Sequence, residues 1–217
     1  MQRAGIVAGV VIALCLAGPA FAQSSGSFSA SYDATQCAIS ANNGTLTSNS
    51  GATVPGNLGT VTVKVSSGSG TALVITPSLV TGLFTDNKIT NTSNSATQNV
   101  GILVTVEVDG TTANVVPELG STGVIYDQRF IQVSSSVISG LAACQALAGA
   151  TCFELVESTL AAHSFNFYIF GLSTGTHDVA VSWTLIGGTN GEGACVGPGT
   201  LTVQQVKNFN FNTPLSF

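Results

Sequence analysis

Charged side chains are scarce in this chain of 217 residues. It contains five Lys or Arg and ten Asp or Glu, which together make up 7% of the residues, against about 25% in an ordinary soluble domain. The basic residues are scattered singly, so the chain cannot neutralise a run of phosphates, and nucleic acid is excluded as a partner. The polar surface must therefore come from Ser, Thr, Asn and Gln, as in many extracellular β proteins.

Residues that carry chemistry are also few. The only histidines are His163 and His177, no Cys-x-x-Cys pair occurs, and no histidine stands near a cysteine. These absences argue against a zinc site, and the lack of Asp-x-Asp-x-Asp spacing argues against a calcium loop. We therefore predict a protein that is not an enzyme, with no catalytic, cofactor-binding or metal-binding residues.

One pattern offers an alternative, a serine hydrolase. Gly171–Gly175 (GLSTG) fits the Gly-x-Ser-x-Gly motif, and His177 and Asp178 follow it closely. In hydrolases the serine sits on a turn between a strand and a helix, and the helix supplies backbone donors. Here an alternating strand follows the motif, so we interpret these residues as a β-turn.

Long apolar runs are absent except at the start of the chain. Arg3 precedes an uncharged apolar stretch over residues 4–17, and Ala20-Phe21-Ala22 offers the small residues that signal peptidase requires. The stretch is shorter than the roughly 20 residues that span a bilayer. We predict a cleaved export signal over residues 1–22 and a single secreted domain over residues 23–217. A retained anchor and a lipid on Cys15 are the alternatives.

Cleavage of that signal would leave four cysteines, an even number in an exported chain. Such a set predicts two disulfides, for which three connectivities exist. Cys144 and Cys152 are close in sequence across a loop-like stretch, so we favour their pairing, which leaves Cys37 to pair with Cys195.

Short segments that alternate apolar and polar residues, the period of a strand with one buried face, dominate the rest of the chain. We expect Val179, Val181, Trp183 and Leu185 to face the core. The predicted strands are 36–40, 60–65, 72–76, 100–108, 124–133, 153–160, 164–170, 177–186 and 200–206. We also predict that 60–65 and 72–76 form a hairpin across the turn at 66–70.

Helical periodicity is nearly absent, which argues against alternating β–α units. Only Ser134–Ala150 has helical leanings, and its glycines would keep any helix short. The pattern predicts an all-β fold, an antiparallel β-sandwich that is jelly-roll-like, with at most one short helix near 134–150.

The C-terminal quarter adds a resemblance. Ser164–Trp183 (SFNFYIFGLSTGTHDVAVSW), a Gly-rich loop and Gly197–Val206 (GPGTLTVQQV) resemble the last strands of uncharacterised secreted bacterial β-sandwich proteins. The resemblance implies a fold and no activity.

The tail Asn208–Phe217 alternates apolar residues and ends on a phenylalanine. Outer-membrane barrels commonly end in this way, so a small outer-membrane barrel is one alternative, although Pro214 would interrupt such a strand. The tail is also the candidate for self-association with another subunit.

These observations predict a non-catalytic secreted or cell-surface protein with a structural, adhesive or ligand-binding role and a protein or glycan partner. A periplasmic or outer-membrane location is also compatible with export, and we expect no integral membrane segment after signal cleavage. A carbohydrate-binding module would need exposed aromatic residues on one sheet face, and the only tyrosines are Tyr32, Tyr126 and Tyr168. A self-assembling surface subunit would need an unpaired strand edge or an inserted terminal strand.

Overall fold

The computed structural model describes residues 26–49, 55–66, 71–90, 95–118, 123–134, 151–188 and 191–207. The predicted export signal, the tail Asn208–Phe217 and residues 135–150 of the predicted short helix lie outside these residues. The described residues form strands, turns and connecting segments, and they contain no helix. Accordingly, no helix in this part of the chain is long and apolar enough to cross a membrane.

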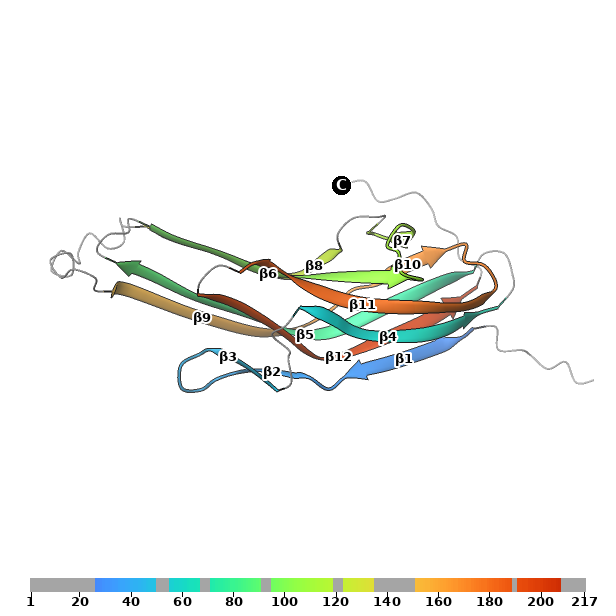
Figure 1. Cartoon of the computed structure of the whole chain (residues 1–217), viewed down its shortest axis with the longest axis horizontal. Coiled ribbons are helices and arrows are strands. Elements are labelled where there is room, and N and C mark those ends of the chain that lie inside the picture. The colour runs from blue at the N-terminus through green and yellow to red at the C-terminus, as the bar shows by residue number, and fades with distance from the viewer. Residues whose placement is uncertain are drawn as a thin grey trace, which may run out of the picture.

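Two antiparallel sheets pack against each other, and their long strands follow the longest axis of the molecule (Figure 1). The six-stranded sheet contains β1 (Phe28–Asp33), β12 (Glu192–Val206), β5 (Ala72–Thr90), β10 (Phe167–Phe170), β7 (Val115–Val116) and β9 (Thr151–Ser164). The four-stranded sheet contains β4 (Gly56–Val65), β11 (Gly175–Gly187), β6 (Ser95–Val108) and β8 (Val124–Ser134). A separate hairpin is formed by β2 (Gln36–Ile39) and β3 (Leu46–Asn49). The predicted antiparallel β-sandwich is confirmed.

Strand β5 is the central strand of the larger sheet. It runs for 19 residues, and β12 pairs along one of its edges from Ala72 to Thr85. On its other edge two strands follow one another: β10 pairs with Ala72–Ile75, and β9 pairs with Ser78–Thr90. The outer face of this sheet is therefore continuous across β1, β12, β5 and the β9/β10 pair.

The core lies between the sheets and is built mainly from Val, Leu and Ile side chains, with Tyr126, Phe167 and Trp183 among them. On β11, the side chains of Val179, Val181 and Trp183 are buried as predicted, and Leu185 is half-buried against the same core. The inward row of β6, the neighbouring strand in the same sheet, is fully buried and consists of Val100, Ile102, Val104, Val106 and Val108.

The predicted hairpin between residues 60–65 and 72–76 is wrong. Strand β4 pairs with β11 in one sheet, whereas β5 pairs with β12, β9 and β10 in the other. Both segments carry a row of apolar side chains. The two rows are buried in the core between the sheets, and the two strands do not pair with each other. Strands β4 and β5 therefore belong to different sheets, although they follow each other in the chain.

Several strands extend beyond their predicted bounds into polar sequence. The polar tract Asn87–Gln98 lies outside the predicted strands 72–76 and 100–108, yet its two ends continue β5 and β6. Polar side chains can occupy these positions because they lie near the end of the sandwich, where Asn87 and Gln98 bond to the backbone carbonyls of Ala96 and Asp86.

Candidate functional site

The outer face of the six-stranded sheet carries the two most exposed aromatic side chains among the described residues. Tyr32 is 79% exposed and Phe28 is 67% exposed, and both lie on β1. They pair with Thr200 and Gln204 of β12, whose neighbour Val203 is buried in the core. Because side chains alternate along a strand, Tyr32 and Phe28 point away from the core and into solvent.

A ladder of hydroxyl groups continues from these aromatic residues across the sheet. The register places Tyr32 beside Thr200, Thr200 beside Ser78, and Ser78 beside Ser164. A second row contains Thr202 beside Thr76, and the Thr76 hydroxyl donates a hydrogen bond of 2.7 Å to Asn166 Oδ1. Four neighbouring strands thus present polar, uncharged groups on one surface.

Two further aromatic residues border the ladder on the side of β10. Tyr168 and Phe170 stack with their ring centroids 6.4 Å apart and their planes 6° apart. They alternate with Phe167 and Ile169, which are buried in the core, so they face outward like Tyr32. Strands β1 and β10 are three strand spacings apart in the sheet, a distance of about 14 Å. We call this surface the aromatic–hydroxyl face; its residues are Phe28, Tyr32, Thr76, Ser78, Ser164, Tyr168, Phe170, Thr200 and Thr202.

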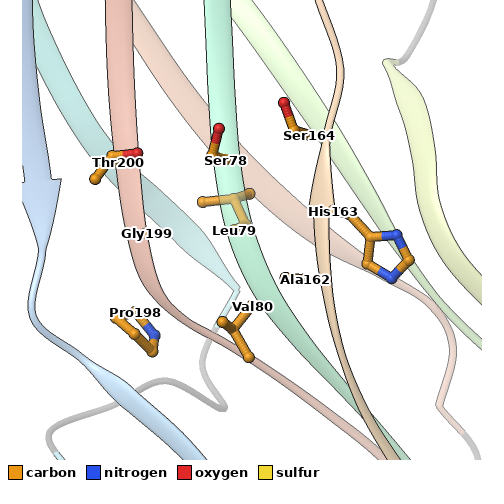
Figure 2. Close-up of a pocket in the computed structure, with 9 residues that line it drawn as sticks. All are labelled: Ser78, Leu79, Val80, Ala162, His163, Ser164, Pro198, Gly199 and Thr200. Atoms are coloured by element: carbon orange, nitrogen blue, oxygen red, sulfur yellow. The ribbon is translucent and has the colours of Figure 1, made fainter.

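A shallow hollow of about 330 Å³ lies within this face, where β12, β5 and β9 run side by side (Figure 2). Small side chains form it, because Ser78, Val80 and Ala162 cannot fill the surface above the strands. Pro198 borders the hollow at a register shift in β12. Figure 2 shows the ring of His163 turned sideways, away from β5. The hollow therefore offers hydroxyl and apolar contacts, with the imidazole at its margin.

The β2–β3 hairpin covers the neighbouring part of the same face. The Cys37–Cys195 disulfide, with a Cα–Cα distance of 5.7 Å, fixes β2 to β12. Further along the hairpin, the Ser158 hydroxyl of β9 donates a hydrogen bond to the Gly44 carbonyl. The hairpin thereby forms a fixed boundary beside the hollow, and the rest of the face stays open.

Two disulfides were predicted, Cys37–Cys195 and Cys144–Cys152. The Cys37–Cys195 pair is confirmed. Cys152 is also disulfide-bonded, but its predicted partner, Cys144, lies outside the described residues, so that pairing stays a prediction. A stable disulfide indicates an oxidising, extracytoplasmic environment.

The serine-hydrolase motif forms a connection between β10 and β11. His177 is buried; its Nδ1 lies 2.7 Å from Asp109 Oδ2, and its Nε2 lies 2.9 Å from the backbone carbonyl oxygen of Ser173. Both partners are acceptors, so both ring nitrogens must donate. The Asp109 hydrogen bond accordingly raises the pKa of His177, and the same contact lowers the pKa of Asp109. An imidazolium that donates from both ring nitrogens has no lone pair with which to accept a proton from the Ser173 hydroxyl. This arrangement supports the interpretation of the motif as a turn.

His163 lies on the other sheet, on β9. Its Nε2 is 3.8 Å from Asp127 Oδ2, which also accepts a hydrogen bond of 3.1 Å from the Thr81 hydroxyl. The two histidines therefore belong to separate clusters. In the described ranges, no group of three or more His, Cys, Asp or Glu is placed to hold a metal ion.

A buried carboxyl group, Glu118, was not singled out from the sequence. Its Oε1 accepts a hydrogen bond of 3.0 Å from the Val106 backbone N–H, while Oε2 has no partner among the described residues. Burial raises the pKa of Glu118 to about 7. Tyr126 is buried as well and donates to the Pro77 carbonyl at 3.0 Å. Of the three tyrosines, only Tyr32 and Tyr168 therefore belong to the outer face.

Sequence reasoning missed strand β1 and with it half of the exposed aromatic residues. The signal was present, since Phe28, Ala30 and Tyr32 alternate with Ser29 and Ser31. This alternation was hard to recognise because Ala30, Ser29 and Ser31 are small and differ little in polarity. The surrounding tract is also rich in Ser and Gly.

Comparison with protein-family models finds no match to this chain, and a search of curated proteins finds no relative. The resemblance of the C-terminal strands to secreted bacterial β-sandwich proteins stays a prediction.

Proposed function

We propose that this chain is a non-catalytic secreted or cell-surface binding module, and that its aromatic–hydroxyl face holds a polysaccharide. The observation that carries the proposal is the placement of the largely exposed Tyr32 and Phe28 beside a ladder of Ser and Thr hydroxyls on the same sheet face. Exposed aromatic residues gathered on one sheet face are what a carbohydrate-binding module requires.

The chemistry of a sugar ring matches this combination. A pyranose has an apolar face of C–H groups and a rim of hydroxyls. Aromatic rings can cover the C–H face with little loss of conformational entropy, because they have only two side-chain torsions. The hydroxyls of Thr76, Ser78 and Thr200, together with the Asn166 amide, can bond to the rim.

Charge narrows the class of ligand. No Lys, Arg, Asp or Glu occupies the outward positions of β1, of β12 from Thr200 onward, of β5 up to Val80, or of β10. An acidic polysaccharide would find no cation to pair with there. The face is therefore suited to an uncharged glycan such as a glucan, xylan, mannan or chitin.

The shape of the face narrows the class further. It is an open surface with a shallow hollow rather than a deep pocket, so it suits the side of a chain and not a chain end. The disulfide and the predicted export signal support a location outside the cytoplasm, where such polymers occur.

The test is a binding screen on the mature chain, residues 23–217. Insoluble cellulose, xylan, mannan and chitin would be used for pull-down assays, with pectate as the acidic comparison. The proposal expects retention on at least one uncharged polymer and none on pectate. Retention on pectate alone, or on none of the five, would overturn it.

A further inference from the structure

A long edge strand, β9, borders the six-stranded sheet on the side opposite β1. Among the described residues it pairs with β5 alone, from Ser164 opposite Ser78 to Thr151 opposite Thr90. The backbone groups on the other side of an edge strand form a template for a further strand. Strand β9 therefore has the geometry to accept a partner.

This edge has few of the features that normally block such pairing. Edge strands are commonly protected by being short, by Lys or Pro, or by a bulge. Strand β9 runs for 14 residues (TCFELVESTLAAHS) without Lys or Pro, its charged residues are Glu154 and Glu157, and its one register shift falls between Thr151 and Phe153. None of its residues is buried. By contrast, the edge strand β1 has only 6 residues.

Strand β9 carries two exposed large hydrophobic side chains, Val156 and Leu160. They have the same parity along the strand as Ala162 and Ser164, so they lie on the outer face of the six-stranded sheet, beside the edge at which a further strand can pair. A strand that pairs at this edge would cover both side chains.

We propose that β9 pairs in an antiparallel manner with β9 of a second copy of this chain. The register that fits places Val156 opposite Leu160 of the other copy. Both residues are 39% exposed and lie on the same face of the strand. By symmetry the pair occurs twice, so four apolar side chains meet around a two-fold axis at Ser158.

Charge supports the same register. With Val156 opposite Leu160, Glu154 lies opposite Ala162, and Glu157 lies opposite Thr159. Like charges directly across two strands would be destabilising, and this arrangement contains none. This register thus brings the apolar side chains of the two copies together and sets no two carboxylates directly opposite each other, which favours a second copy over an unrelated strand.

This dimer goes beyond the proposed glycan binding and does not depend on it. Sedimentation velocity of the mature chain over a wide concentration range measures the oligomeric state directly. The expected result is a concentration-dependent species of twice the chain mass. Leu160→Lys should weaken dimerisation more than about tenfold, because two like charges enter the apolar cluster. The control Phe28→Lys, which changes an exposed aromatic residue on the opposite edge strand, should stay dimeric.

The register has its own test. Glu157→Cys and Thr159→Cys chains, when mixed and oxidised, should form a disulfide-linked dimer, because the two positions face each other. Neither variant should cross-link alone. A monomeric wild type, a dimer that Leu160→Lys leaves intact, or the absence of the mixed cross-link would each overturn the proposal. None of these outcomes affects the binding screen, so failure of the dimer and failure of the glycan face are distinguishable.

Discussion

Gly82 lies opposite Cys195 in the β5–β12 ladder, and the disulfide of Cys195 occupies the space that any larger residue at position 82 would need. A Cβ atom on Gly82 would lie 2.6 Å from Cys37 Sγ and 2.8 Å from Cys195 Sγ. Both distances are too short for a real contact. The glycine is therefore a packing requirement of the disulfide that holds the β2–β3 hairpin on the sheet.

Gly82→Ala should accordingly destabilise the protein by about 1–3 kcal/mol, the usual cost of inserting a methyl group into filled space. The same substitution should cost much less when Cys37→Ala and Cys195→Ala have removed the sulfur atoms. Urea denaturation of the four proteins in this cycle measures the coupling. An equal cost in both backgrounds would show that the disulfide is not what excludes a side chain at position 82.

The contact between His177 and Asp109 predicts a specific pH dependence. The raised pKa of His177 means that its contribution to stability is complete below the ordinary value of 6.5 and is lost as pH rises through the folded-state value. The lowered pKa of Asp109 means that its contribution is present above the ordinary value of 3.8 and is lost as pH falls through the folded-state value. The pair therefore stabilises most between about pH 4 and 6.5.

Asp109→Asn should reduce the free energy of unfolding within that pH window by no more than about 1 kcal/mol, because the Asp109 side chain is half exposed and screened by solvent. Denaturation of wild type and variant at pH 5.5 and pH 9 measures the effect. The difference between the two proteins should shrink at the higher pH. If it were larger at pH 9, the imidazolium assignment would be wrong.

Burial of Glu118 predicts a second effect of pH. Between the ordinary value of 4.5 and the folded-state value of about 7, the folded protein keeps a proton that the unfolded chain has released. The free energy of unfolding therefore falls as pH rises through this window, by up to about 3 kcal/mol. Glu118→Gln removes the titrating group and should remove this dependence.

The two proteins should thus have similar stability near pH 4.5, and Glu118→Gln should be the more stable near pH 8. Urea midpoints at these two pH values suffice, with Glu157→Gln, which changes an exposed carboxylate on β9, as the control. Equal midpoints for wild type and Glu118→Gln at pH 8 would show that ionisation of the buried Glu118 carboxyl group does not destabilise the folded protein.

The dimer and the glycan face together predict avidity. Pairing through β9 continues one sheet into the next, so the two aromatic–hydroxyl faces would lie on the same side of a joined sheet. Two linked sites bind a long polymer more tightly than one, with no new contact. Leu160→Lys should therefore weaken binding to a long polysaccharide and leave binding of a short oligosaccharide unchanged, as affinity electrophoresis and calorimetry can show. Equal losses for both ligands would count against the bivalent arrangement.

Much of the fold could be predicted from the sequence, because strand periodicity is a local property. Val179, Val181 and Trp183 alternate with polar residues, and the structure buries them as expected. Pairing between strands is not local. Residues 60–65 and 72–76 are neighbours in the chain and satisfied every requirement of a hairpin, but the two rows pack across the core.

The candidate face was harder to predict, because it depends on register. Tyr32 and Ser164 stand far apart in the chain and enter one row only through Thr200 and Ser78. No local pattern contains that relationship. The Cys37–Cys195 pairing could be predicted, because the other two cysteines are close in sequence and elimination left one choice.

The most direct test of the proposed function compares two exposed aromatic residues on opposite sheets. Tyr32 lies on the aromatic–hydroxyl face, whereas Phe130, 64% exposed, lies on β8 of the other sheet. Affinity electrophoresis of both alanine variants against the polysaccharide retained in the screen measures their contributions. Tyr32→Ala should weaken binding at least about tenfold, the loss of one well-placed aromatic contact, and Phe130→Ala should bind like wild type. Undiminished binding by Tyr32→Ala, or an equal loss in Phe130→Ala, would contradict the assignment of the ligand to this face.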